Sequence, residues 1–481
     1  MSERDGLCMI RNKKGFTMPM VIFIIAVVVI IIAIIFSYNT NYASYNTNIT
    51  NMEKALQIAE AGINAYLYHL SQDPDFHRDT KGIQIKDGSE ELGLVPLSFD
   101  DEGLPIRYKI TSCKDNKNNT VGFYQISLVQ PAFNRDLEII STGWTNDDEE
   151  IRKTVSIKLK NNNFCEYLLF TNGENTFYTG NTIKGSVFSN EDINIVSSEY
   201  GNPKFEEDLI SAKSINTTGN PRINGAVLQH QPKMRFPDPA DNKEKIAKYA
   251  DLSYTGRTCI LLNGKYLKIR NHTDGDTLQT KEITKPYTIF VKDGPVFISG
   301  ELNGRLTVYS TEDIYITGKD PTNMYIYSAA VTGGIKYSNT NIPNKNSSGG
   351  NYSNDMLGLI SENNIIIATR TWPDSTNGTR KLDQTPVSSK DMTIYGTLMA
   401  ADNIEIEDSY PYFPTLNTLK LYGSQVCKNI NLQSKDEYNA YKELTNTYDY
   451  RLKTDYPLYI VSSEYSEWVI KAWEELLSPP N

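Results

Sequence analysis

The organisation of this chain is decided by residues 13–20, Lys-Lys-Gly-Phe-Thr-Met-Pro-Met, and by the apolar run over residues 21–36 that follows them. Residues 16–36 carry no charged side chain and number 21. A helix of that length, at about 1.5 Å rise per residue, spans the hydrocarbon core of a bilayer. The stretch therefore predicts a membrane anchor near the N-terminus.

The charges on either side of this anchor predict its orientation. Arg11, Lys13 and Lys14 precede the apolar run, and the next basic residue is Lys54. The positive-inside rule then predicts a cytoplasmic N-terminus and a body on the extracellular or periplasmic side. A cleaved secretory signal is the alternative, but the residues after Phe36 fit its small-residue cleavage site poorly.

The rest of the chain has the composition of an acidic, soluble body. The whole chain has 481 residues, 39% of them hydrophobic, with 31 Tyr and a net charge of −10. Removal of residues 1–15 takes away four basic and two acidic residues, which leaves 44 Lys and Arg against 56 Asp and Glu, a net charge of −12. We expect no nucleic acid partner, because phosphate binding requires clustered Lys and Arg.

The anchor continues as a longer helix, because apolar residues recur at alternating steps of four and three through residues 37–72. A strand would alternate at every second residue. The pattern predicts one helix that runs to about Leu70 and stops before Asp73-Pro74. Its stripe could pack on other subunits near the membrane and on its own domain farther out. The stripe consists of Tyr38, Tyr42, Tyr45, Ile49, Met52, Leu56, Ala59, Ile63, Tyr66 and Leu70.

The basic-Gly-Phe-Thr junction at residues 13–17 resembles the leader of type IV pilins and pseudopilins. Residues 55–63, Ala-Leu-Gln-Ile-Ala-Glu-Ala-Gly-Ile, resemble the helix of PilX-like minor pilins. This resemblance implies that a prepilin peptidase cuts between Gly15 and Phe16 and that the new N-terminal Phe16 is methylated. Family members usually carry Glu at the fifth mature position, where this chain has Met20. That departure, together with the size of the chain, points to a minor subunit.

Residues 73–160 predict an antiparallel sheet against which the distal helix could bury its stripe, since short alternating runs are separated by polar turns. Helix followed by meander resembles a pilin head, as does Ser141-Thr142-Gly143 before the last of these strands. The acidic residues 147–150 are interpreted as a solvated hairpin tip, with a cation site as the alternative.

A repeated unit fills residues 161–430: a small residue, a polar turn and then Ile-x-Ile. Two apolar side chains at alternate positions share one face of a short strand. Repeats of this kind predict a right-handed parallel β-helix, interrupted by loops near residues 337–354 and 372–385, with a β-sandwich as the alternative. The copies lie at residues 189–195, 310–316, 361–367 and 400–406, with a degraded one at 211–217.

The tail, residues 431–481, predicts an α-helical cap over one end of the β-helix. Its helices are expected at residues 436–444 and 464–477, the second with Trp468, Ile470, Trp473 and Leu477 on one face. Residues 448–452 resemble the closing segment of β-helix domains that bacteria attach to pilin-like anchors.

No residue pattern predicts catalysis, a metal site or a cofactor. The four His are far apart, and no Walker, Rossmann or Ser-His-Asp pattern occurs. The loop at residues 271–276 contains Asp274 and Asp276 and is interpreted as a turn, with Ca²⁺ binding as the alternative. Cys113, Cys165, Cys259 and Cys427 have no C-x-x-C spacing, so we expect isolated buried thiols.

The sequence thus predicts a non-enzymatic, mainly β protein with a long N-terminal helix. We expect a minor pilin or pseudopilin that sits in or at the tip of a filament and displays its β-helix for assembly or adhesion. Expected partners are other pilins, prepilin peptidase, the membrane, and a surface glycan or host ligand. The alternative is a membrane-anchored β-helix that binds or cleaves a cell-surface polysaccharide.

Overall fold

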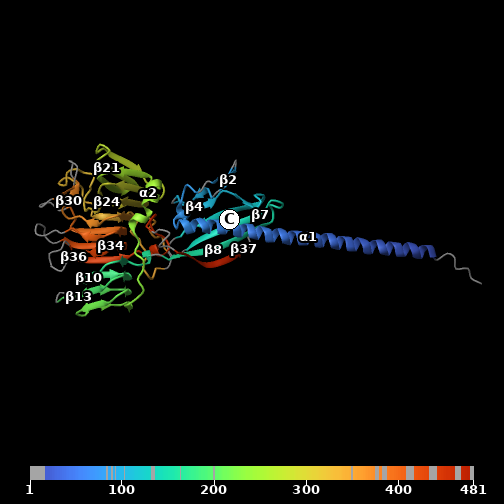
Figure 1. Ribbon diagram of the computed structural model, residues 1–481, viewed down its shortest axis with the longest axis horizontal. Helices are drawn as coiled ribbons and strands as arrows, with labels where there is room; N and C mark the ends of the chain where they lie inside the picture. Colours follow the sequence, from blue (N-terminus) through green and yellow to red (C-terminus); the bar gives the residue numbers. More distant parts are fainter. Residues whose placement is uncertain are drawn as a thin grey trace, which may run out of the picture.

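The computed structural model describes residues 17–82, 85–87, 90–92, 94–101, 103–131, 136–162, 164–198, 201–347, 350–373, 379–381, 387–407, 416–432, 441–460 and 467–476. A long helix, α1 (Thr17–Gln72), projects from a β head, and a larger β body lies beyond the head (Figure 1). With 56 residues, α1 is about 84 Å long. It ends directly before Asp73-Pro74, as the sequence predicts.

The head is an antiparallel sheet packed on the distal part of α1. The strand order is β3-β4-β6-β7-β8-β37, and β5 pairs with β6. Ala59, Ile63 and Tyr66 of α1 are fully buried against Ile126, Ile139 and Ile157 of the sheet, among other residues. The bounds are β3 (Pro96–Phe99), β4 (Pro105–Tyr108), β5 (Thr111–Lys114), β6 (Thr120–Val129), β7 (Leu137–Thr145), β8 (Arg152–Asn162) and β37 (Glu467–Leu476), with a separate hairpin of β1 (Ile85–Asp87) and β2 (Glu90–Leu92).

The prediction of an α-helical C-terminal cap is wrong. Residues 441–448 form strand β36 and residues 467–476 form β37, while 436–440, 464–466 and 477 lie outside the described residues. β37 pairs antiparallel with β8, with Glu467 opposite Asn162, and so closes the head sheet rather than the β-helix. Pairing with β8 satisfies the backbone of β37 and overrides the helix propensity of its Glu, Lys and Ala residues. The whole β body is therefore inserted between two neighbouring strands of the head.

The body is a parallel β-helix, as predicted, and a β-sandwich is excluded because its coils pair in parallel. Residues 258–264, 266–271 and 278–282 pair antiparallel with one another and form a local extension of one coil. Ile314, Ile365 and Ile404 are neighbours in consecutive coils, as are Ile316, Ile367 and Ile406. Its strands are β9 (Leu169–Thr171), β10 (Asn175–Tyr178), β11 (Asn181–Lys184), β12 (Val187–Ser189), β13 (Ile193–Val196), β14 (Lys204–Phe205), β15 (Leu209–Ser211), β16 (Ile215–Thr218), β17 (Arg222–Ile223), β18 (Val227–Leu228), β19 (Leu252–Thr255), β20 (Thr258–Gly264), β21 (Tyr266–Asn271), β22 (Leu278–Glu282), β23 (Tyr287–Lys292), β24 (Val296–Leu302), β25 (Arg305–Ser310), β26 (Ile314–Ile316), β27 (Gly334–Tyr337), β28 (Met356–Ser361), β29 (Ile365–Ile367), β32 (Asp391–Ala400), β33 (Asn403–Ile406), β34 (Leu416–Cys427), β35 (Asn429–Asn431) and β36 (Tyr441–Tyr448).

The short elements outside these coils are few. β30 (Thr371–Pro373) and β31 (Thr379–Lys381) form a hairpin, so part of the loop predicted at 372–385 is extended. α2 (Lys243–Tyr249) packs beside the coils. The 3₁₀ turns are η1 (Phe76–Arg78), η2 (Phe164–Glu166), η3 (Pro239–Asn242) and η4 (Tyr450–Lys453).

A serine forms the corner before several of the Ile-x-Ile strands. The Oγ of Ser310 accepts the N–H of Glu312 at 3.1 Å and donates to the carbonyl of Gly294 at 3.3 Å. Ser361 repeats both contacts one coil on, with Asn363 at 3.1 Å and Glu312 at 2.9 Å. One hydroxyl therefore fixes the turn and ties it to the neighbouring coil, which explains the serine at the start of four of the five repeats; the copy at residues 400–406 begins with Ala400 instead.

The coils do not stack in chain order. The first coil pairs with the last, because β9 lies beside β34 and β11 beside β36. Residues 169–228 extend the stack from there in one direction, and residues 252–448 make up the remainder. The chain between these parts runs along the stack, where Met234 exchanges two hydrogen bonds with Asn190, at 2.7 and 2.9 Å.

Candidate functional site

The predicted site residues lie on α1 and before it. Arg11, Lys13, Lys14, Gly15 and Phe16 lie outside the described residues. Met20 lies in the first turns of α1 and is 61% exposed. Within the described ranges, α1 is the one helix long and apolar enough to cross a membrane. The most apolar 18 residues of this helix are wholly exposed in the isolated chain, as a surface that faces lipid or other helices would be.

The apolar stripe of α1 has two parts, one buried against the head sheet and one exposed. In the distal part, Ala59 and Ile63 are fully buried against the head sheet and Leu56 packs at its edge. In the proximal part every stripe residue is exposed in the isolated chain. Their exposed fractions are 69% for Tyr38, 56% for Tyr42, 62% for Tyr45, 36% for Ile49 and 44% for Met52.

Small residues hold the distal part of α1 against the sheet. A Cβ on Gly143 of β7 would stand 2.4 Å from the backbone nitrogen of Ala59 and 2.6 Å from the carbonyl oxygen of Ala55. A Cβ on Gly62 would stand 2.4 Å from the Oγ of Ser141. The helix and sheet backbones therefore approach closely, which leaves α1 anchored at one end while the proximal part stands free.

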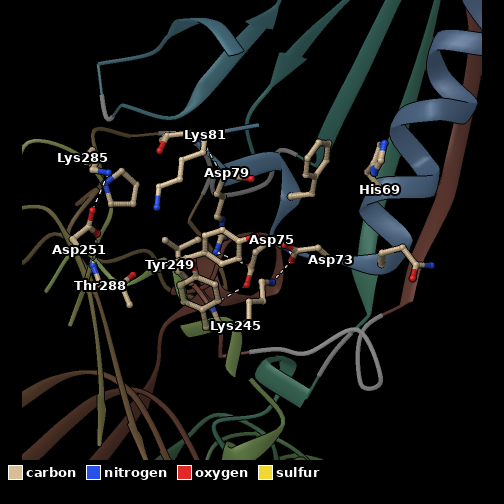
Figure 2. Close-up of a pocket in the computed structure, with 17 residues that line it drawn as sticks. His69, Asp73, Asp75, Asp79, Lys81, Lys245, Tyr249, Asp251, Lys285 and Thr288 are labelled. Carbon is tan, nitrogen blue, oxygen red and sulfur yellow. Dashed lines mark hydrogen bonds and ion pairs between the residues drawn. The ribbon is translucent and has the colours of Figure 1, made fainter. Parts of the chain in front are cut away.

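A charged cleft of about 180 Å³ lies where the end of α1 meets the β-helix (Figure 2). Asp73 forms an ion pair with Lys245 of α2 on one wall. On the other wall Asp251 pairs with Lys285 at 2.9 Å and accepts the N–H of Thr288, also at 2.9 Å. The charged residues that line the cleft balance in number, so neither sign is in excess; they are Asp73, Asp75, Asp79 and Asp251 and Arg78, Lys81, Lys245 and Lys285.

Buried charges continue behind this cleft. Asp455, from the end of the β-helix, accepts Arg78 of η1 at 2.7 Å and both Nη atoms of Arg305 at 2.9 and 2.5 Å. Burial raises the pKa of Asp455, but Arg305 and Arg78 outweigh it and hold that pKa at about 2. Asp75 accepts the N–H of Tyr459 at 2.8 Å, and burial raises the pKa of Asp75. The head and the β-helix are thus joined by charge-assisted hydrogen bonds.

Two alternatives for cation binding receive no support from the geometry. Asp276 contacts Arg257 at 3.5 Å and His272 at 3.2 Å, and Asp274 accepts the side chain of Gln279 at 2.5 Å. In the acidic hairpin, Asp148 accepts the N–H of Glu150 at 3.1 Å. Across the part of the chain that the structure describes, no three acidic, His or Cys side chains gather as a metal site.

The cysteines follow the expectation with one exception. Cys113, Cys165, Cys259 and Cys427 are free thiols, and Cys113 is only half-buried. Burial raises the pKa of Cys259 and Cys427 to about 12, so these two thiols are protonated at neutral pH.

The sequence did not predict the junction residues. Asp455 lies 377 positions from Arg78 and 150 from Arg305, and no local pattern links positions so far apart. One local signal of the junction is the run Asp73-Pro74-Asp75, which ends α1. Its two carboxylates are not fully exposed as a helix end in solvent would be: Asp75 is buried and Asp73 half-buried.

Comparison with known proteins gives structural similarity only. No protein-family model and no curated protein matches the chain. Among solved structures, the chain is similar to the competence-associated pilin ComZ from Thermus thermophilus, at 12% identity and a TM-score of 0.32, over 89% of this chain and 98% of that one. It is also similar to an ice binding protein from an Antarctic Biological Consortium, at 10% identity and a TM-score of 0.20, over 59% of this chain and 86% of that one.

Proposed function

We propose that this chain is a minor type IV pilin or pseudopilin whose helix packs among other pilins in or at the tip of a filament. The proposed role is structural, with no catalysis by this chain. The proposal rests mainly on the apolar stripe of α1, which we call its seam. This continuous seam is buried against the chain's own head in its distal part and exposed in its proximal part. Exposed tyrosines at helical spacing outside the membrane span favour neighbouring helices as partners.

Three further features support this proposal. The Lys-Lys-Gly-Phe-Thr junction at residues 13–17 is a candidate for prepilin peptidase cleavage and methylation. Met20 stands where a repeating subunit usually has Glu, which favours a minor subunit. The β-helix lies at the opposite end of the molecule from the apolar half of α1, where a membrane-anchored filament would display it outward (Figure 1).

The seam can be tested by replacing Tyr42 and Tyr45 with Ala in the full chain. We expect the amount of protein that co-purifies with sheared filaments to fall at least tenfold, while the thermal midpoint of the isolated protein stays unchanged, because both rings are exposed in the monomer. Tyr68→Ala is the matched control, since Tyr68 is 64% exposed on the same helix but lies off the proximal seam.

Mass spectrometry of the wild-type chain tests the processing. We expect a mature N-terminus at Phe16. An uncut leader, or a double variant that enters filaments as well as wild type does, would contradict the proposal.

A further inference from the structure

A loop of the β-helix between β26 and β27 holds two tyrosine rings in solvent. Tyr325 is 73% exposed and Tyr327 is 79% exposed, and Val331 of the same loop is 69% exposed. Outside α1, these are the three most exposed large hydrophobic residues in the described part of the chain. Apolar surface of this extent on an outer loop is typical of a contact site.

The loop is ordered by its own contacts. Ile326, between the two tyrosines, is 4% exposed and packs with Ala329, Ala368, Trp372 and Val387. A bridge between Lys319 and Val331 closes the loop. Its backbone is tied further by side chains, for Asn323 Oδ1 accepts the N–H of Tyr325 at 2.9 Å. The rings are therefore presented by a fixed frame, so that a ligand would not have to order the backbone.

The position of this loop suits contact with something outside the filament. Ile326 packs against Trp372 of β30. Figure 1 shows β30 on the side of the β-helix that faces away from α1 and the head. If the chain is anchored through α1, this loop therefore lies beside the part of the β-helix that is farthest from the membrane.

The charge of the loop indicates the kind of ligand. No charged side chain lies between Asp320 and Lys336, although the chain has a net charge of −10. The two cations that contact the loop donate to its backbone: Lys319 to the carbonyl of Ile326 at 3.5 Å and Arg270 to the carbonyl of Thr322 at 2.9 Å. A lipid surface or a nucleic acid would call for Lys or Arg beside the rings. A sugar chain without charges needs no such cation, because its C–H faces stack on aromatic rings and its hydroxyls bond to polar groups such as those of Asn323 and Ser328.

We propose that Tyr325 and Tyr327 form a docking surface for an uncharged polysaccharide. This proposal rests on the proposed function in one respect, namely that the β-helix is displayed outside the cell.

The test is binding of the full chain, kept in detergent, to insoluble cellulose, chitin and mannan, with the anionic polymers alginate and pectate as a comparison. We expect binding to at least one neutral polymer, with little change on addition of salt, and weaker binding to both anionic ones. Tyr325→Ala combined with Tyr327→Ala should lower that affinity at least tenfold. Tyr266→Ala on β21, where the ring is 46% exposed, should leave it unchanged.

Retention of binding in the double variant overturns the proposal, as does failure of wild type to bind any neutral polymer. Stronger binding to the anionic polymers, or to phosphatidylcholine vesicles, overturns it too. The thermal midpoint of the double variant shows that it is folded. Co-purification with filaments is measured on the same samples. A chain that binds glycan but does not enter filaments contradicts the pilin role alone. A chain that enters filaments but does not bind glycan contradicts the docking surface alone.

Discussion

Asp455 is the residue on which the joint between the head and the β-helix depends most directly. It is 4% exposed and sits between two guanidinium groups, one from each part of the molecule. Removing one partner of a buried ion pair is costly because the remaining charge has been taken out of water and has lost its counter-charge. In this molecule two cations share one carboxylate, so the loss affects both sides of the joint.

Asp455→Asn should therefore destabilise the protein by about 3–5 kcal/mol. Chemical denaturation of the full chain in detergent, followed by tryptophan fluorescence, measures the change. Asp402→Asn is the control, because Asp402 pairs with Lys428 at 3.8 Å with both side chains more than half exposed, and its loss should cost less than about 0.5 kcal/mol. Equal effects of the two substitutions would contradict the role given to Asp455.

The same carboxylate predicts a dependence on pH. Its pKa is about 2 in the folded chain, below the ordinary value of about 3.9 for an unfolded Asp. A depressed folded pKa contributes stability that is fully present above about pH 4 and is lost as the pH falls toward 2. The stability difference between wild type and Asp455→Asn should shrink over that window. A difference that stays constant from pH 6 to pH 2.5 would show that ionisation of Asp455 is not responsible.

At the scale of single elements, α1 is the decisive one, and its two halves differ in what surrounds them. The distal half meets β7 so closely that Gly143 has no room for a Cβ, and there Ala55 and Ala59 present almost no side chain. Close backbone approach of this kind fixes the position and rotation of the helix. The rotation in turn decides which face the proximal half offers to neighbours.

Gly143→Ala should move α1 away from the sheet and destabilise the head by about 1–3 kcal/mol, as overpacking does. It should also reduce co-purification with filaments, since the exposed seam would be displaced. Val121→Ala on the neighbouring strand β6 removes a side chain that is 41% exposed and should change stability by less than about 0.5 kcal/mol. Thermal unfolding of both variants is the measurement. An unaltered midpoint for Gly143→Ala would mean that the helix accommodates the methyl group without cost.

At the scale of the whole molecule, the β-helix is an insertion. β8 ends at Asn162 and β37 begins at Glu467, and these two residues face each other across the same antiparallel pair. The head sheet is thus completed by a strand that follows the β-helix in the chain.

Replacement of residues 163–466 by a short Gly-Ser turn should therefore leave a folded head on α1. We expect cooperative thermal unfolding and a β-sheet circular dichroism spectrum, because the core of the head contains no residue of the β-helix. A chain that stops at residue 162 is the control and should be much less stable, since it lacks β37 and exposes the edge of β8. Equal stability of the two chains would show that β37 is dispensable.

The sequence by itself determined the features that depend on neighbours in the chain. Three such features are local. Residues 16–36 are an unbroken run without charge, apolar residues from Tyr38 to Leu70 recur at steps of four and three, and the body repeats Ile-x-Ile. A local run or period is visible in the sequence whatever the chain packs against. The tertiary structure decided the rest. β37 has the residues of a helix, and a bulge between Ile470 and Ala472 interrupts its alternation, so only its pairing with β8 makes it a strand. The stacking of the first coil on the last and the joining of Arg78, Arg305 and Asp455 likewise depend on contacts between distant positions, which no local period records.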